Sequence, residues 1–78
     1  MDKSRINRVI VDEFDRLAFL TDLEKSVLVT RAAGKSLKWQ EMNLHVSQAT
    51  ISRIVKRIQK KYEAVKEFSA MLPDDLEI

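Results

Sequence analysis

Residues 45–57 read HVSQATISRIVKR and contain the strongest pattern in the chain. A helix selected for stability alone would be rich in Ala, Leu, Glu and Lys, but Gln48, Thr50 and Ser52 are mediocre helix formers. Ser47 is a good N-cap. Apolar residues recur every three or four positions after it, which predicts a helix with one buried side. The residues on the opposite side must therefore serve something other than helix formation.

The composition indicates one small, helical domain. Glycine and proline occur once each in 78 residues, which favours helices joined by short turns over a β-rich fold. A chain of this length carries a single core. The absence of cysteine excludes disulfides and thiolate metal sites and fits a reducing compartment. Because no long apolar run and no signal-peptide pattern are present, we expect a soluble, cytoplasmic protein.

The net charge of +2 conceals an uneven distribution of charge along the chain. Residues 35–66 contain eight basic and two acidic side chains, whereas residues 67–78 contain four acidic side chains and no basic one. A basic middle segment with an acidic end indicates a surface that faces a polyanion.

Periodicity and capping signals predict an all-α fold, a small bundle of about four helices with a long C-terminal helix. Thr21 and Glu24 form a capping-box pattern, and Gly34 is a plausible stop for the helix that they open. Ser36 and Ser47 are the N-caps of the two helices that follow. The predicted helices cover, in order, residues 4–20, 22–33, a short segment within 35–46, and 48–72.

We assign residues 1–72 to one domain with a helix-turn-helix motif at about 36–57, and residues 73–78 to an acidic, flexible tail. His45 falls where a tight turn is needed, so we expect a turn residue with positive φ rather than a metal ligand. Two orientations of the short helix remain open. Its inner face is made either by Leu37, Gln40 or Glu41, and Leu44, or by Trp39, Met42 and Val46.

The sequence contains no pattern typical of an enzyme. GKS at residues 34–36 resembles the end of a phosphate-binding loop, but that motif needs a further glycine where this chain has Val29, and a strand before it. With no cysteine and one histidine, the chain shows no catalytic cluster. We therefore expect no enzymatic activity, no cofactor and no metal.

The short helix, tight turn and Ser-capped helix together predict binding to double-stranded DNA. A helix that enters the major groove reaches base edges with its first turns, where Gln pairs with adenine and Arg with guanine. We expect base contacts from Gln48, Ala49, Ser52 and Arg53. Contacts to the DNA backbone are expected from Lys35, Ser36, Lys38, Ser47, Thr50, Lys56 and Arg57.

Residues 20–62 resemble the helix-turn-helix domains of LuxR-type response regulators and of region 4 of sigma factors. The LuxR-type pattern runs approximately LTPREREVL, a GKS-like junction, and SNKEIAEELGISEKTVKRHLSNIYRKL. This chain reads LTDLEKSVL, GKS and SLKWQEMNLHVSQATISRIVKRIQKKY without a gap. The family has an apolar residue and an alanine where this chain has Gln40 and Glu41, and a glycine in place of His45. The resemblance implies DNA binding by a recognition helix.

The far end of the last helix has two interpretations. It forms a homodimer seam, or it packs on the helix predicted at residues 4–20 within the same chain, and the pattern favours neither. The candidate seam residues are Ile58, Tyr62, Val65, Phe68 and Leu72.

We therefore expect a sequence-specific DNA-binding transcriptional regulator of bacterial or phage origin, located at the nucleoid when bound to DNA. One alternative is a sigma-like module that contacts RNA polymerase as well as promoter DNA. Another is an adaptor or inhibitor of transcription that uses the same fold to bind a protein.

Overall fold

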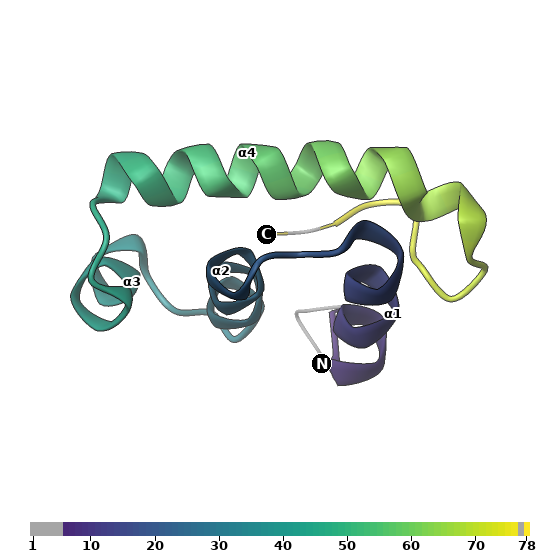
Figure 1. Ribbon diagram of the computed structural model, residues 1–78. Helices are drawn as coiled ribbons and strands as arrows, with labels where there is room; N and C mark the ends of the chain where they lie inside the picture. Colours follow the sequence, from purple (N-terminus) through teal and green to yellow (C-terminus); the bar gives the residue numbers. More distant parts are fainter. Residues whose placement is uncertain (1–5, 77) are drawn as a thin grey trace.

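The computed structural model describes residues 6–76 and 78 and confirms the all-α class, with four α-helices and no strand among the described residues. The helices α1 to α3 lie side by side, and α4 crosses all three of them (Figure 1). A short 3-10 turn, η1, follows α4. The elements are α1 (Arg8–Ala18), α2 (Asp22–Ala32), α3 (Leu37–Leu44), α4 (Gln48–Val65) and η1 (Lys66–Phe68).

Side-chain caps determine where all four described α-helices begin. At α2 the capping box is complete, because Thr21 Oγ1 accepts from the Glu24 N–H at 3.1 Å and Glu24 Oε1 accepts from the Thr21 N–H at 2.9 Å. Ser36 and Ser47 accept from backbone N–H groups three residues later and open α3 and α4. All three predicted caps are confirmed. The first helix begins at Arg8 with Asn7 as its cap, and residues 4 and 5 of its predicted range lie outside the described residues.

Two predicted helix ends were wrong, the first for a local reason and the second because of packing against residues distant in sequence. The first helix ends at Ala18 because Phe19 adopts a left-handed conformation with φ 54°. The last helix ends at Val65 instead of residue 72. Beyond η1 the chain turns back so that Leu72 enters the core and the Tyr62 hydroxyl donates to the Pro73 carbonyl. Burial of Leu72 therefore outweighs extension of the helix into solvent.

We predict a flexible acidic arm over residues 73–78, but the described residues Leu76 and Ile78 of this segment lie against the helices. Leu76 and Ile78 pack against the hydrophobic core. The Arg31 guanidinium donates to the Ile78 carbonyl at 3.4 Å. The acidic side chains Asp74 and Asp75 remain exposed, so this segment covers part of the core and still presents negative charge to solvent.

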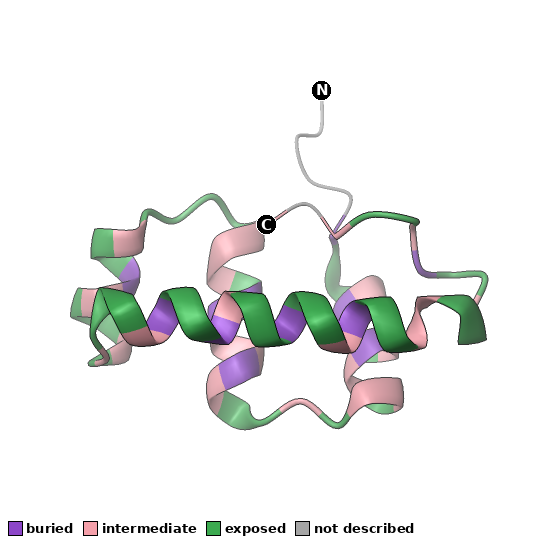
Figure 2. Cartoon of the chain, turned by 90° about the horizontal axis from the view of Figure 1, so that it is seen from above, coloured by how far each residue is buried: buried purple, intermediate pink, exposed green. Residues whose placement is uncertain are grey.

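The main core lies between α4 and the two N-terminal helices. Phe14 of α1 and Tyr62 of α4 form an edge-to-face pair with ring centroids 5.1 Å apart. Figure 2 shows buried residues along the inner side of α4 and exposed ones on its outer side. The buried apolar residues are Ile6, Val11, Phe14, Val27, Leu28, Ile51, Ile54, Ile58, Tyr62 and Leu72.

This packing shows which residues at the far end of the last helix are buried within one chain, while a homodimer stays a prediction. Ile58, Tyr62 and Leu72 are buried within the chain, so they are not free to form a seam with a second copy. Val65 is half-buried, and Phe68 is 76% exposed. For the three buried residues the correct interpretation is packing within one chain, because α1 supplies the apolar face that they need.

The turn between α3 and α4 holds His45 in the left-handed region, with φ 60°, as predicted. Left-handed backbone is costly for any residue that carries a Cβ. We expect His45→Gly to raise the free energy of unfolding by about 0.5–1 kcal/mol, less than the full conformational gain because glycine is also freer in the unfolded chain. Thermal unfolding measures the change. His45→Ala is the matched control, and an equal gain in both variants would contradict the conformational explanation.

Candidate nucleic-acid interface

The first two turns of α4 present the predicted base-reading residues to solvent. Gln48, Ala49, Ser52 and Arg53 are all exposed, while Ile51 between them is fully buried. Helical spacing therefore places the four on the outer side of a helix whose inner side is anchored in the core. Because Ala49 and Ser52 are small, the helix backbone can approach a flat or grooved partner closely.

The predicted DNA-backbone residues divide between α4 and the junction before α3. Lys35, Ser36 and Lys38 are exposed at that junction, and the Lys35 ammonium lies 5.0 Å from the centre of the Trp39 ring. On α4, Ser47, Lys56 and Arg57 are exposed and Thr50 is half-buried. The Ser47 hydroxyl donates to Thr50 Oγ1 at 2.9 Å, so these two side chains are partly occupied in capping α4.

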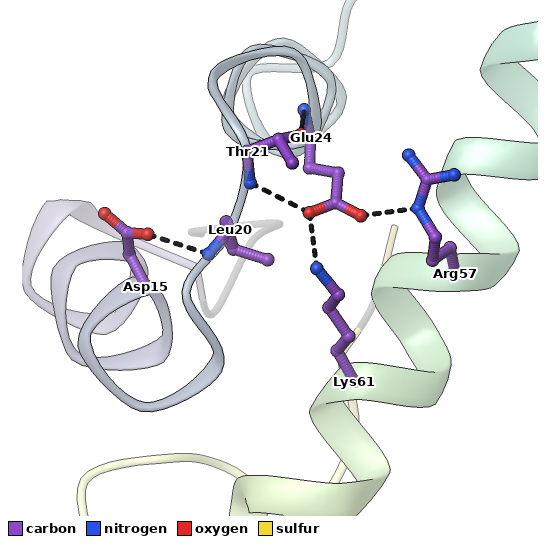
Figure 3. Close-up of polar contacts among 6 residues, drawn as sticks. All are labelled: Asp15, Leu20, Thr21, Glu24, Arg57 and Lys61. Carbon is purple, nitrogen blue, oxygen red and sulfur yellow. Dashed lines mark hydrogen bonds and ion pairs between the residues drawn. The ribbon is translucent and has the colours of Figure 1, made fainter.

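The cations of α4 fall into two groups, those that pair with a buried carboxylate and those that do not. Glu24 at the start of α2 is fully buried and lies between two cations of α4 (Figure 3). Arg57 Nε donates to Glu24 Oε2 at 2.5 Å, and Lys61 Nζ donates to Glu24 Oε1 at 2.7 Å. These ion pairs join α2 to α4 and hold the long helix in one position on the bundle.

The turn before α2 fixes where Glu24 sits. Asp15 of α1 accepts from the Leu20 N–H at 3.1 Å with one carboxylate oxygen (Figure 3). Its other carboxylate oxygen accepts from Lys25 Nζ at 3.1 Å. Both bonds tie the start of α2 to α1. The helix start that carries Glu24 is therefore held from both sides, by α1 and by α4.

Opposing effects act on the Glu24 carboxyl. Burial raises the pKa of Glu24, but hydrogen bonds from Lys61, the Thr21 backbone and Arg57 together outweigh it and lower the pKa from its ordinary value of 4.5 to about 2. The carboxylate is therefore ionised throughout the physiological range. Its negative charge compensates cations of α4 that would otherwise face solvent unpaired.

One predicted DNA-backbone residue takes part in this network. Arg57, for which we predict a contact to the DNA backbone, donates from Nε to Glu24 and so stabilises the packing of α4 on α2. Its contact to DNA stays a prediction. By contrast, Arg53, Lys56 and Lys60 are exposed and have no acidic partner within the part of the chain that the structure describes. Their spacing of three and four residues aligns them along the outer side of α4. We call these three residues the free cation stripe.

Sequence reasoning missed Lys60, although a signal for it existed. Lys60 lies four residues after Lys56, so helical periodicity alone puts both on one side of α4. The pairing of Lys61 and Arg57 with Glu24 had no such local signal, because the partners are 37 and 33 residues apart. The capping box identified the hydrogen bond between Glu24 and Thr21 but not the ion pairs of Glu24.

The two departures of α3 from the LuxR-type pattern each make a contact to a neighbouring helix. Gln40 is fully buried, and its Nε2 donates to the Val27 carbonyl at 3.2 Å and to Thr30 Oγ1 at 2.8 Å, both on α2. Its Oε1 is buried with no hydrogen-bond partner among the described residues. Glu41 accepts from Gln48 Nε2 at 2.9 Å and so contacts α4. Of the two orientations left open for α3, the structure has the one that faces Leu37, Gln40 and Leu44 inward.

The far end of α4 is electrostatically different from its beginning. Lys66 pairs with Glu63 at 3.1 Å and also donates to the Asp74 carbonyl. The hydrogen bond to Glu63 raises the pKa of Lys66, and the nearby charges of Asp74 and Asp75 add to this effect. The positive charge of α4 without an acidic partner among the described residues is therefore carried by its middle part, at Arg53, Lys56 and Lys60.

Comparisons with protein-family models, with curated proteins and with solved structures found no match to the chain. In the described part of the chain no group of three or more His, Cys, Asp or Glu side chains is placed to hold a metal ion. None of the described helices is long and apolar enough to cross a membrane.

Proposed function

We propose that the chain binds double-stranded DNA with sequence preference, as a small transcriptional regulator, and that the first turns of α4 enter the major groove. The observation that carries this proposal is the outer side of α4. Small and polar side chains occupy its first two turns, and the free cation stripe continues along the same side. A major groove about 12 Å wide admits an α-helix of about 10–12 Å diameter.

The side chains on this surface suit two kinds of contact, to bases and to phosphates. Gln48 and Arg53 carry donors that match the edges of adenine and guanine. Lys56 and Lys60 lie further along α4 and supply compact charges for phosphates, as do Lys35 and Lys38 at the start of α3. Backbone contacts provide most of the affinity, and base contacts set the preference among sequences.

Titration with duplex DNA at two salt concentrations tests the proposal. If about four lysines each neutralise one phosphate, the affinity should fall about 100-fold between 50 and 200 mM salt. Binding that is absent, or that does not depend on salt, would reject DNA as the partner.

Arg53→Ala should weaken binding to the preferred sequence by about 1–3 kcal/mol and relax the preference at one base pair. Lys56→Ala should instead weaken binding to all sequences alike and reduce the salt slope by about 1. Fluorescence anisotropy on a preferred and a random duplex measures both effects. Arg16→Ala on α1 is the control with the same change in charge. Unchanged binding by the Arg53 variant on both duplexes would show that the reading face is misplaced.

The second candidate is an adaptor or inhibitor of transcription that uses the same fold to bind a protein. A sigma-like module that binds promoter DNA and also contacts RNA polymerase is a further alternative. The observation in favour of the adaptor is the exposure of Phe68 and Met71, which the exposed acidic residues Asp74 and Asp75 follow closely in the sequence. Apolar side chains next to negative charge suit a basic protein surface better than DNA. The salt titration separates the adaptor from the DNA-binding candidates, because an adaptor that binds only protein has no affinity for the duplex.

A further inference from the structure

The first residue of α4 is linked to the neighbouring helix by a hydrogen bond on the proposed reading surface. Gln48 Nε2 donates to Glu41 Oε1 at 2.9 Å. Gln48 is exposed and Glu41 is half-buried. The helix α3 that carries Glu41 lies beneath the N-terminal end of α4 (Figure 1). Among the described residues no other side-chain hydrogen bond joins α3 to α4, so Glu41 is the side chain of α3 best placed to control how the Gln48 amide points.

The bond changes what the Gln48 amide can offer to a third group. A free glutamine amide has two N–H donors and one carbonyl acceptor. One donor is committed to Glu41, so Gln48 keeps one N–H and its carbonyl oxygen. The Glu41 carboxylate beside them accepts hydrogen bonds and has no donor to give. The pair therefore presents one donor among several acceptors.

We infer that Glu41 is a specificity-determining residue that restricts the bases Gln48 can bind, an inference that rests on the proposed DNA-binding function. Adenine offers one acceptor, N7, and one donor, the N6 amino group, which match the remaining N–H and the carbonyl of Gln48. Cytosine offers an N4 amino donor that either carbonyl or carboxylate accepts. Guanine offers two acceptors, N7 and O6, and these face a single donor and a negative carboxylate. The pair thus favours adenine, admits cytosine and disfavours guanine.

Glu41 makes the difference between this pair and a glutamine that stands alone. Without Glu41, both N–H groups of Gln48 are free to donate to N7 and O6 of guanine, and the nearby negative charge is gone. Glu41→Ala should therefore permit guanine where the native chain excludes it. Because Gln48 is otherwise unchanged, binding to adenine at that position should persist.

Selection of bound sequences from a random duplex pool tests this inference on the native chain and on Glu41→Ala and Gln48→Ala. One position of the native profile should favour adenine over guanine. The ratio of the affinities for duplexes that differ only by adenine or guanine there should fall about tenfold in Glu41→Ala. Gln48→Ala should lose the preference at the same position. Glu13→Ala on α1, which packs against the opposite end of α4 from Gln48, removes the same charge and should keep the native profile.

A measurement without DNA tests the hydrogen bond by itself. The side-chain amide resonances of Gln48 in a ¹⁵N-labelled sample should shift in Glu41→Ala and stay in place in Glu13→Ala. An unmoved Gln48 amide would overturn the inference. So would identical profiles for the native chain and Glu41→Ala, and the proposed DNA-binding function would then still stand. If the native chain enriches no sequence and shows no salt-dependent binding, the proposed function fails and the inference fails with it.

Discussion

Replacing Glu24 with glutamine should lower the free energy of unfolding at pH 7 by about 3 kcal/mol, which for a domain of this size lowers Tm by about 10–20 °C. Glutamine retains the ability to accept from the Thr21 N–H, as capping boxes allow either residue. The variant therefore removes the ion pairs with Arg57 and Lys61 and keeps the cap. Thermal unfolding followed by circular dichroism measures the loss.

The dependence of this loss on pH identifies its cause. The pKa of Glu24 is lowered in the folded chain from 4.5 to about 2, so its stabilisation is fully present above pH 4.5 and is lost as pH falls toward 2. The difference between the native chain and Glu24→Gln should shrink over that window. Glu63→Gln, which breaks an exposed pair with Lys66, is the control and should change Tm far less. A difference that stays constant from pH 7 to pH 2 would show that the ion pairs are not responsible.

Phe14→Ala should lower the free energy of unfolding by about 3–5 kcal/mol, or Tm by about 15–30 °C, because it leaves a cavity against Tyr62 and removes the edge-to-face pair. The chain contains its own matched control in Phe19, which is 83% exposed five residues later. Phe19→Ala keeps the left-handed turn and should leave stability nearly unchanged. Similar losses in both variants would mean that α1 is not packed on α4 as described.

The packing of Tyr62 also gives an expectation for the oligomeric state. If Tyr62 packs against α1 within one chain, its burial does not require a second copy, and Tm should not depend on protein concentration. A Tm that rises with concentration would restore the dimer seam as an interpretation.

Local signals predicted the start of the helices well, because a cap is a contact between residues three positions apart. Thr21, Ser36 and Ser47 each satisfy a backbone N–H that has no partner within the helix, and the structure confirms all three. The turn at His45 was predictable for a similar reason, since two helices that lie so close in sequence need one residue in left-handed conformation to reverse direction.

The end of α4 was not predictable from local signals. No glycine or proline occurs between Ser47 and Pro73, so propensity alone extends the helix. The helix stops at Val65 because Leu72 is buried against distant residues, and distance in sequence hides that competition. The same limit applies to the candidate site. Exposure of Gln48 and Arg53 follows from periodicity, whereas the engagement of Arg57 by Glu24 depends on how α2 crosses α4.

The link between Glu24 and α4 constrains folding during synthesis on the ribosome. The N-terminal helices leave the ribosome first, with Phe14 and Glu24 exposed, and their partners Arg57, Lys61 and Tyr62 emerge only later. Before α4 is available, Glu24 lacks its two cations and Phe14 lacks Tyr62, so we expect α1 and α2 to form no stable arrangement of their own. The nascent chain should therefore remain sensitive to proteases until α4 is released, and then fold in a single cooperative step.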